Sequence, residues 1–141
     1  MTDKVAQQLW NARVDGTKIP NDFAGSPQSE DEAYEIQASM IAASGLDVAG
    51  WKIGATVEAL FEVLGVSQPF LGPLFQRFTH DNGVALPILP GTSIETEVTV
   101  RLDADLPARE QPYARAEIEA AVASIQPSFE IVGARFEGGL A

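Results

Sequence analysis

The sequence has 141 residues, of which 45% are hydrophobic and 21% charged, and this is the size and composition of one globular domain. Twenty acidic residues against nine lysines and arginines give a net charge of −11, which disfavours binding to nucleic acids and to anionic membrane surfaces. Cysteine is absent and histidine occurs once, so disulfides, zinc–cysteine sites and multi-histidine metal sites are excluded.

The sequence also favours a cytoplasmic protein. No apolar run approaches the roughly 20 residues that a membrane-spanning helix needs. The first ten residues are polar and lack the apolar stretch of a secretory signal. Because cysteine is absent and histidine occurs once, carboxylates, lysines and hydroxyl groups are the main side chains that can carry chemistry.

The first half of the chain is predicted to be mostly helical. Helices are expected at residues 3–14, 29–44 and 56–64, and a short strand at residues 48–53. Ser29 and Glu32 have the spacing of a capping box, which predicts where the second helix begins. Trp10 and Trp51 are both expected to be core residues.

The second half is predicted to be mostly β. Residues 65–83 are expected to be irregular, with strands at 84–87, 92–102 and 128–136 and a crossover helix at 113–124. Helices followed by strands predict an α+β fold. We expect a single domain, 1–141, with a helical part at 1–47 and a β-rich core from residue 48 onwards.

Three glutamates stand in strands that are otherwise suited to burial. Glu95 and Glu97 are two residues apart, so both side chains point to the same face of their strand. Glu130 interrupts another apolar run, and the crossover helix is expected to make the two strands neighbours. All-oxygen ligation of this kind suits magnesium, manganese or calcium better than zinc. The alternative is a solvated strand face or a salt bridge, which each glutamate taken alone would favour.

Lys52 is the other candidate for chemistry. It lies between two glycines in the sequence Gly-Trp-Lys-Ile-Gly, and glycines permit close approach of a ligand or another strand. In an apolar setting a lysine can act as an acid or base, or hold a substrate carboxylate. Spacing alone favours the simpler interpretation, a lysine whose amine pairs with one of the many carboxylates. His80 lies in a loop sequence and is expected to face solvent.

Several segments, taken in order, resemble the 2-keto-4-pentenoate hydratases of the fumarylacetoacetate hydrolase superfamily. The segments that carry the resemblance are residues 50–56 (GWKIGAT), 64–69 (LGVSQP), 72–75 (GPLF), 94–98 (IETEV), 105–107 (DLP) and 127–132 (PSFEIV). The resemblance runs from the N-terminal helices to the last residue. It implies a β-rich mixed-sheet core of the fumarylacetoacetate hydrolase-like type, and a chain that corresponds to the N-terminal portion of such an enzyme.

The resemblance also implies a site. The three acidic ligands of a divalent metal, Mg²⁺ or Mn²⁺, match Glu95, Glu97 and Glu130. The active-site lysine matches Lys52, and the backbone from Gly72 to Leu74 would shape the substrate pocket. One departure is Phe70, where the family often has an acidic residue.

The implied activity is a metal-dependent lyase reaction. Water would add to a 2-hydroxy-2,4-dienoate, or its 2-keto tautomer, to give a 4-hydroxy-2-keto acid. Three alternatives remain. Two are enzymes of the same superfamily, a decarboxylase or a C–C hydrolase, although the Glu–His dyad common in the hydrolases is not seen. The third is an inactive truncated module that pairs its open strand edges with a partner. We expect a homo-oligomer that binds a small 2-keto acid, with no nucleic-acid or membrane partner.

Overall fold

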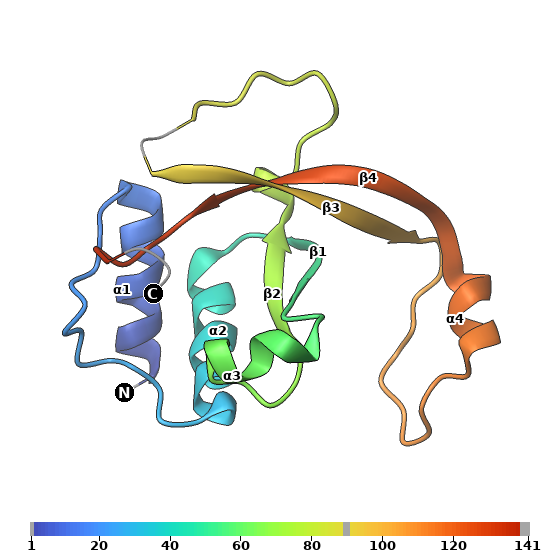
Figure 1. The fold of residues 1–141 in the computed structure, drawn as a ribbon, viewed down its shortest axis with the longest axis horizontal. Helices are drawn as coiled ribbons and strands as arrows, with labels where there is room; N and C mark the ends of the chain where they lie inside the picture. The colour runs from blue at the N-terminus through green and yellow to red at the C-terminus, as the bar shows by residue number, and fades with distance from the viewer. Residues whose placement is uncertain (1, 89–90, 139–141) are drawn as a thin grey trace. The chain divides into compact units, whose positions relative to one another are not determined.

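The computed structural model describes residues 2–88 and 91–138. The chain divides into two compact units. The helical unit comprises the residues up to Pro87 together with the segment from Ala134, and the ribbon unit comprises Ile88–Gly133 (Figure 1). The expectation of a single domain stays a prediction.

Two helices form the first layer of the helical unit. Helix α1 spans Thr2–Asp15 and helix α2 spans Glu30–Ser44. Ser29 caps α2 as predicted, since its hydroxyl accepts a hydrogen bond from the backbone N–H of Glu32 at 3.2 Å. The Glu32 carboxylate accepts from the N–H of Gln28 at 2.8 Å. Gly45 ends the helix in the left-handed conformation, with φ of 62°, which is inexpensive only for glycine.

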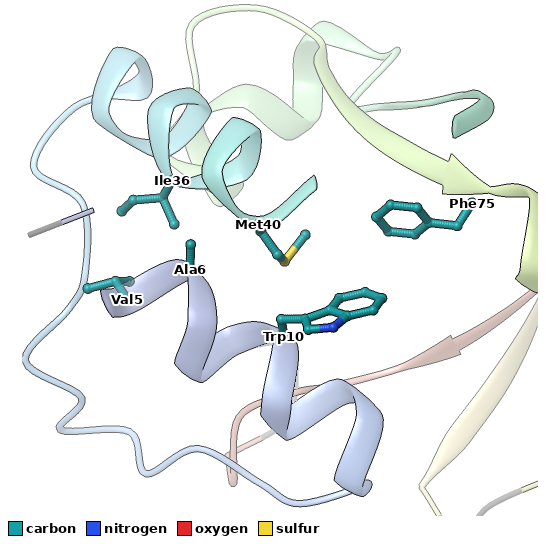
Figure 2. Packing of buried hydrophobic residues seen from close by; sticks show 6 residues of the cluster. All are labelled: Val5, Ala6, Trp10, Ile36, Met40 and Phe75. Carbon is teal, nitrogen blue, oxygen red and sulfur yellow. The ribbon is translucent and has the colours of Figure 1, made fainter. Parts of the chain in front are cut away.

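The core of the helical unit lies where these helices meet a β-hairpin. Its buried members are the side chains of Val5, Ala6, Trp10, Ile36, Met40 and Phe75. Trp10, Met40 and Phe75 point toward one another from α1, α2 and the end of a strand (Figure 2). The rings of Trp10 and Phe75 meet edge to face, with centroids 5.4 Å apart. The prediction that Trp10 is a core residue is confirmed, whereas Trp51 is half exposed and the prediction for it is wrong.

The hairpin consists of β1 (Val48–Gly54) and β2 (Phe70–Phe75), which pair antiparallel. Between them lie a 3-10 turn, η1 (Glu58–Leu60), and the short helix α3 (Phe61–Leu64). Helix α2 holds one edge of β2, because the Tyr34 hydroxyl accepts from the N–H of Leu71 at 3.0 Å and the Gln37 amide donates to its carbonyl at 2.9 Å. A second 3-10 turn, η2 (Gln76–Phe78), follows β2.

The ribbon unit is a long antiparallel pair of strands. Strand β3 spans Thr92–Leu102, as predicted, and pairs along its length with β4 (Val122–Gly133). Helix α4 (Arg115–Ala121) lies in the connection between them (Figure 1). In the described part of the chain, both named sheets are two-stranded and antiparallel. Ile19 and Phe136 form an isolated bridge in which the two segments run parallel. The expected mixed sheet is therefore not formed by these residues.

Five predictions of secondary structure differ from the structure. The helix expected at 113–124 ends at Ala121, and β4 begins at Val122, because the β-branched residues that follow suit a strand. Pro127 does not break this strand, since a strand paired on one side can tolerate a missing N–H. The same tolerance explains Pro73 inside β2, in a stretch predicted to be irregular.

The helix expected at 56–64 is present only as η1 and α3, and no residue of either is buried. The strand expected at 84–87 is not formed. No helix among the described residues is long and apolar enough to cross a membrane.

Candidate metal centre

The register of the ribbon brings the three glutamates to one face. Glu95 stands directly opposite Glu130, and Glu97 stands opposite Ser128. Directly opposed residues of an antiparallel pair share a face, and so do residues two apart along a strand. All three carboxylates consequently project from the same side of the β3–β4 ribbon.

Their oxygen atoms are close enough to share one ion. One carboxylate oxygen from each of Glu95, Glu97 and Glu130 lies within 4.8 Å of the other two. Glu97 and Glu130 are half-buried, Glu95 is exposed, and one oxygen of Glu130 is shielded from solvent. Three carboxylates in this arrangement fit a hard cation such as Mg²⁺, Mn²⁺ or Ca²⁺, which prefers oxygen ligands. The convergence expected from the sequence is present in the structure, and the role of these residues as metal ligands stays a prediction.

Hydroxyl groups continue the polar face beyond the glutamates. The Thr99 and Ser128 hydroxyls are 2.7 Å apart, and Ser128 is the cross-strand partner of Glu97. Neither residue was among the candidates predicted from the sequence. The signal that could have found Ser128 was its period-2 spacing from Glu130, which places both on one face.

The opposite face of the ribbon is apolar and exposed. Its members include Ile94, Val98, Val100, Ile125 and Phe129, whose exposed fractions run from 50% for Val100 to 75% for Phe129. The charged side is thus the less exposed side of this ribbon, the reverse of the usual pattern for a strand that faces solvent.

Lys52 and the predicted pocket residues belong to the helical unit. On the β1–β2 hairpin, Lys52 stands opposite Gly72, and Leu74 stands opposite Gly50. Lys52, Gly72 and Leu74 therefore share one face of the hairpin. A β-carbon added to Gly72 would lie 4.0 Å from the β-carbon of Lys52, which is ordinary contact. Lys52 is half-buried, and its predicted role in substrate binding or proton transfer is not tested by this geometry.

Gly54 satisfies the expectation of a close approach at the end of β1. A β-carbon on this residue would lie 2.4 Å from the ring of Phe70, its cross-strand partner. Phe70 is the residue that departs from the family's acidic position, so this side chain covers the glycine rather than offering a carboxylate.

An ion pair in the ribbon unit joins Arg109 to Glu117. The Arg109 guanidinium donates to both oxygens of Glu117, at 2.9 and 2.7 Å, and holds the pKa of Glu117 below its ordinary value. The backbone N–H of Ala114 donates to the same carboxylate at 2.8 Å. This pair fixes the start of α4.

Comparison with known proteins gives the family. No family model matches the chain. It is 31% identical to a 2-hydroxypent-2,4-dienoate hydratase of Pseudomonas putida over 97% of its own length and 64% of the relative's. It is 33% identical to a 2-keto-4-pentenoate hydratase of Paraburkholderia xenovorans, with 94% and 51% covered. The chain is a relative of the 2-keto-4-pentenoate hydratases.

Solved structures agree with this relationship to the hydratases. The fold matches a 4-oxalocrotonate decarboxylase from Pseudomonas putida G7, complexed with calcium and acetate, with a TM-score of 0.80 and 26% identity. A second structure of that decarboxylase, complexed with magnesium and adipate, matches with a TM-score of 0.75 and 25% identity. The chain spans 54% and 53% of these structures, about half of their length. The α+β fold and the resemblance to the hydratases are therefore confirmed.

Proposed function

We propose that this chain carries the divalent-metal site of an enzyme that adds water to a 2-hydroxy-2,4-dienoate, giving a 4-hydroxy-2-keto acid. The observation that carries the proposal is the convergence of Glu95, Glu97 and Glu130 within 4.8 Å on one face of the ribbon. Support comes from relatives named as hydratases and from matching structures of a decarboxylase complexed with calcium and acetate or with magnesium and adipate.

The residues of the chain have distinct parts in this proposal. Glu95, Glu97 and Glu130 would hold the ion through their converging carboxylates. A bound Mg²⁺ or Mn²⁺ supplies Lewis acidity and positive charge for the oxygen on C2 of the substrate. Lys52 holds the substrate carboxylate or transfers a proton, with Gly72 and Leu74 on the same hairpin face as the contacts for the substrate.

The metal site can be tested without a substrate. Titration of the chain with MnCl₂ in a calorimeter should show one saturable site, and Glu97→Gln or Glu130→Gln should abolish or greatly weaken it. Glu62→Gln is the matched control, because it removes one carboxylate of the same type from an exposed position on α3. Equal Mn²⁺ affinity in the wild-type chain and in both ribbon variants would refute the site.

The reaction is tested with two substrates side by side. A hydratase should consume 2-hydroxypenta-2,4-dienoate in a Mg²⁺- or Mn²⁺-dependent manner, and Lys52→Ala should abolish turnover or greatly raise KM. A second candidate activity is decarboxylation of a vinylogous 2-keto diacid, which the match to a 4-oxalocrotonate decarboxylase favours. Faster turnover of 4-oxalocrotonate than of the dienoate would select it.

A non-enzymatic module is the remaining candidate, and the exposed apolar face of the ribbon favours it. Ile125 and Phe129 are 68% and 75% exposed, and a two-stranded ribbon with such a face gains stability when another surface covers it. Concentration-dependent association measured by sedimentation, together with no turnover of either substrate in the presence of Mn²⁺, would favour this function over the enzyme.

A further inference from the structure

Three arginines of the helical unit gather at one edge of its core. The Arg13 guanidinium carbon lies 4.5 Å from the ring centroid of Phe78, and that of Arg77 lies 5.9 Å from the same centroid. Arg135 approaches from the C-terminal segment, with a guanidinium nitrogen 3.8 Å from the Met40 sulfur. Segments far apart in the sequence thus place three positive charges around one apolar surface.

The scaffold beneath these arginines is fixed by packing. Phe78 meets Phe75 edge to face, with centroids 6.4 Å apart, and Phe75 in turn packs on Trp10. Arg13 follows Trp10 by three residues on α1, so it lies one turn further along the helix. The Arg13 guanidinium is therefore attached to a helix at the rim of the buried cluster, and Arg77 stands in the turn η2 beside Phe78.

The segment that carries Arg135 is also held in place. The backbone N–H of Ile19 donates to the carbonyl of Arg135 at 2.9 Å, and the N–H of Glu137 donates to the carbonyl of Ile19 at 3.0 Å. The Lys18 amine donates to the carbonyl of Ala134, which adds a fourth cation next to this segment. Positive charge is thereby concentrated in a chain whose net charge is −11.

Within the described residues, Arg13, Arg77 and Arg135 differ from two arginines of the ribbon unit, which form ion pairs with glutamates. Among residues 2–88 and 91–138, no ion pair joins Arg13, Arg77 or Arg135 to a carboxylate, whereas Arg109 and Arg115 pair with glutamates at 2.7 and 2.6 Å. Burial lowers the pKa of Arg135, and the nearby charge of Arg13 lowers it further. A guanidinium keeps its proton under all ordinary conditions, so proton loss does not relieve this repulsion.

We propose that Arg13, Arg77 and Arg135 form a binding site for a small oxyanion, a carboxylate or a phosphate group. An anion held there would offset the mutual repulsion of the arginines and would accept charge-assisted hydrogen bonds from Arg13 and Arg135. Arg13 is exposed and Arg135 half-buried, so an anion can reach both from solvent while losing part of its screening. The site belongs to the helical unit, and the candidate metal ligands belong to the ribbon unit.

Anion binding to the whole 141-residue chain tests the proposal. Thermal unfolding and calorimetry should be followed during titration with inorganic phosphate and, separately, with malonate, at constant ionic strength and without divalent metal. Saturable binding of either anion is expected, and the stronger of the two identifies the preferred group. Because a hydrogen bond to a charged group contributes about 1.5–3 kcal/mol, Arg135→Gln should weaken binding by roughly 10- to 100-fold.

Two further variants complete the design. Arg13→Gln removes an exposed charge, so it can replace Arg135→Gln in the test if that variant does not fold. It should also weaken anion binding. Arg115→Gln is the matched control, since it removes one arginine from an exposed pair on α4 and should leave the affinity unchanged. Absence of saturable binding, or equal affinity in the wild-type chain and in Arg13→Gln, would overturn the proposal.

Discussion

Replacing Phe75 with alanine should destabilise the helical unit strongly. Phe75 is only 4% exposed, and it joins α1 and α2 to the end of β2 through its packing on Trp10 and Met40 (Figure 2). Removal of a buried phenylalanine side chain typically costs about 3–5 kcal/mol, which includes the cavity left behind. The edge-to-face contacts with Trp10 and Phe78 place Phe75→Ala in the upper part of this range.

The assay is urea unfolding followed by tryptophan fluorescence. Both tryptophans, Trp10 and Trp51, belong to the helical unit, so the signal reports this unit and not the ribbon. Trp51 is 50% exposed and Trp10 is buried, so most of the change on unfolding should come from Trp10. The midpoint for Phe75→Ala should fall sharply, and Phe75→Leu should lie between it and the wild type.

The comparison needs a surface control on the same unit. Val63 on α3 is 77% exposed, so Val63→Ala should change the free energy of unfolding by no more than about 0.5 kcal/mol. If Phe75→Ala lowers the free energy of unfolding by less than about 1 kcal/mol, with an unchanged slope of the urea dependence, the central role of Phe75 in core packing is refuted.

Three smaller predictions concern a cap, a close contact and an ion pair. Ser29→Ala should cost about 1 kcal/mol in urea unfolding because it removes the cap of α2, and an unchanged midpoint would contradict this. Gly54→Ala should lower the free energy of unfolding by an amount at the low end of about 1–3 kcal/mol, because the new β-carbon displaces the partly exposed Phe70 ring. This loss of stability should disappear when the substitution is made together with Phe70→Ala. The pKa of Glu117 is lowered first by Arg109, so the stabilisation by this pair is complete above the ordinary glutamate pKa and is lost as pH falls through the lowered value. In an NMR titration, Arg109→Gln should raise the pKa of Glu117, and an unchanged pKa would show that the guanidinium is not the cause.

Strong local signals predicted part of the fold well. The cap at Ser29, the helix end at Gly45 and the whole extent of β3 follow from residues whose preference is set by their immediate neighbours. The local sequence pattern gave the wrong secondary structure where pairing between strands decides it. Residues 122–124 were predicted to end a helix, but they pair with β3 as the start of a strand that continues through Pro127.

The convergence of the three glutamates could be predicted in part from the sequence. Period-2 geometry placed Glu95 and Glu97 on one face without any knowledge of the fold. The position of Glu130 needed the register, which sequence alone does not supply, because any partner within reach could have faced Glu95. The arginine group was beyond prediction, since its members lie 58 or more positions apart from one another along the chain.

The pairing of β3 with β4 has a consequence for changes of chain length. Twelve residues, 103–114, precede α4 in the link between the strands, so no tight turn dictates which residues face each other. Additions or deletions in this link should leave the carboxylate cluster intact. Deleting a single residue from β4 between Val122 and Ser128 would either place a different residue opposite Glu95 or turn the Glu130 side chain to the other face of the ribbon. Homologous sequences should therefore vary in length within the link and keep a fixed count from the start of β4 to the third glutamate.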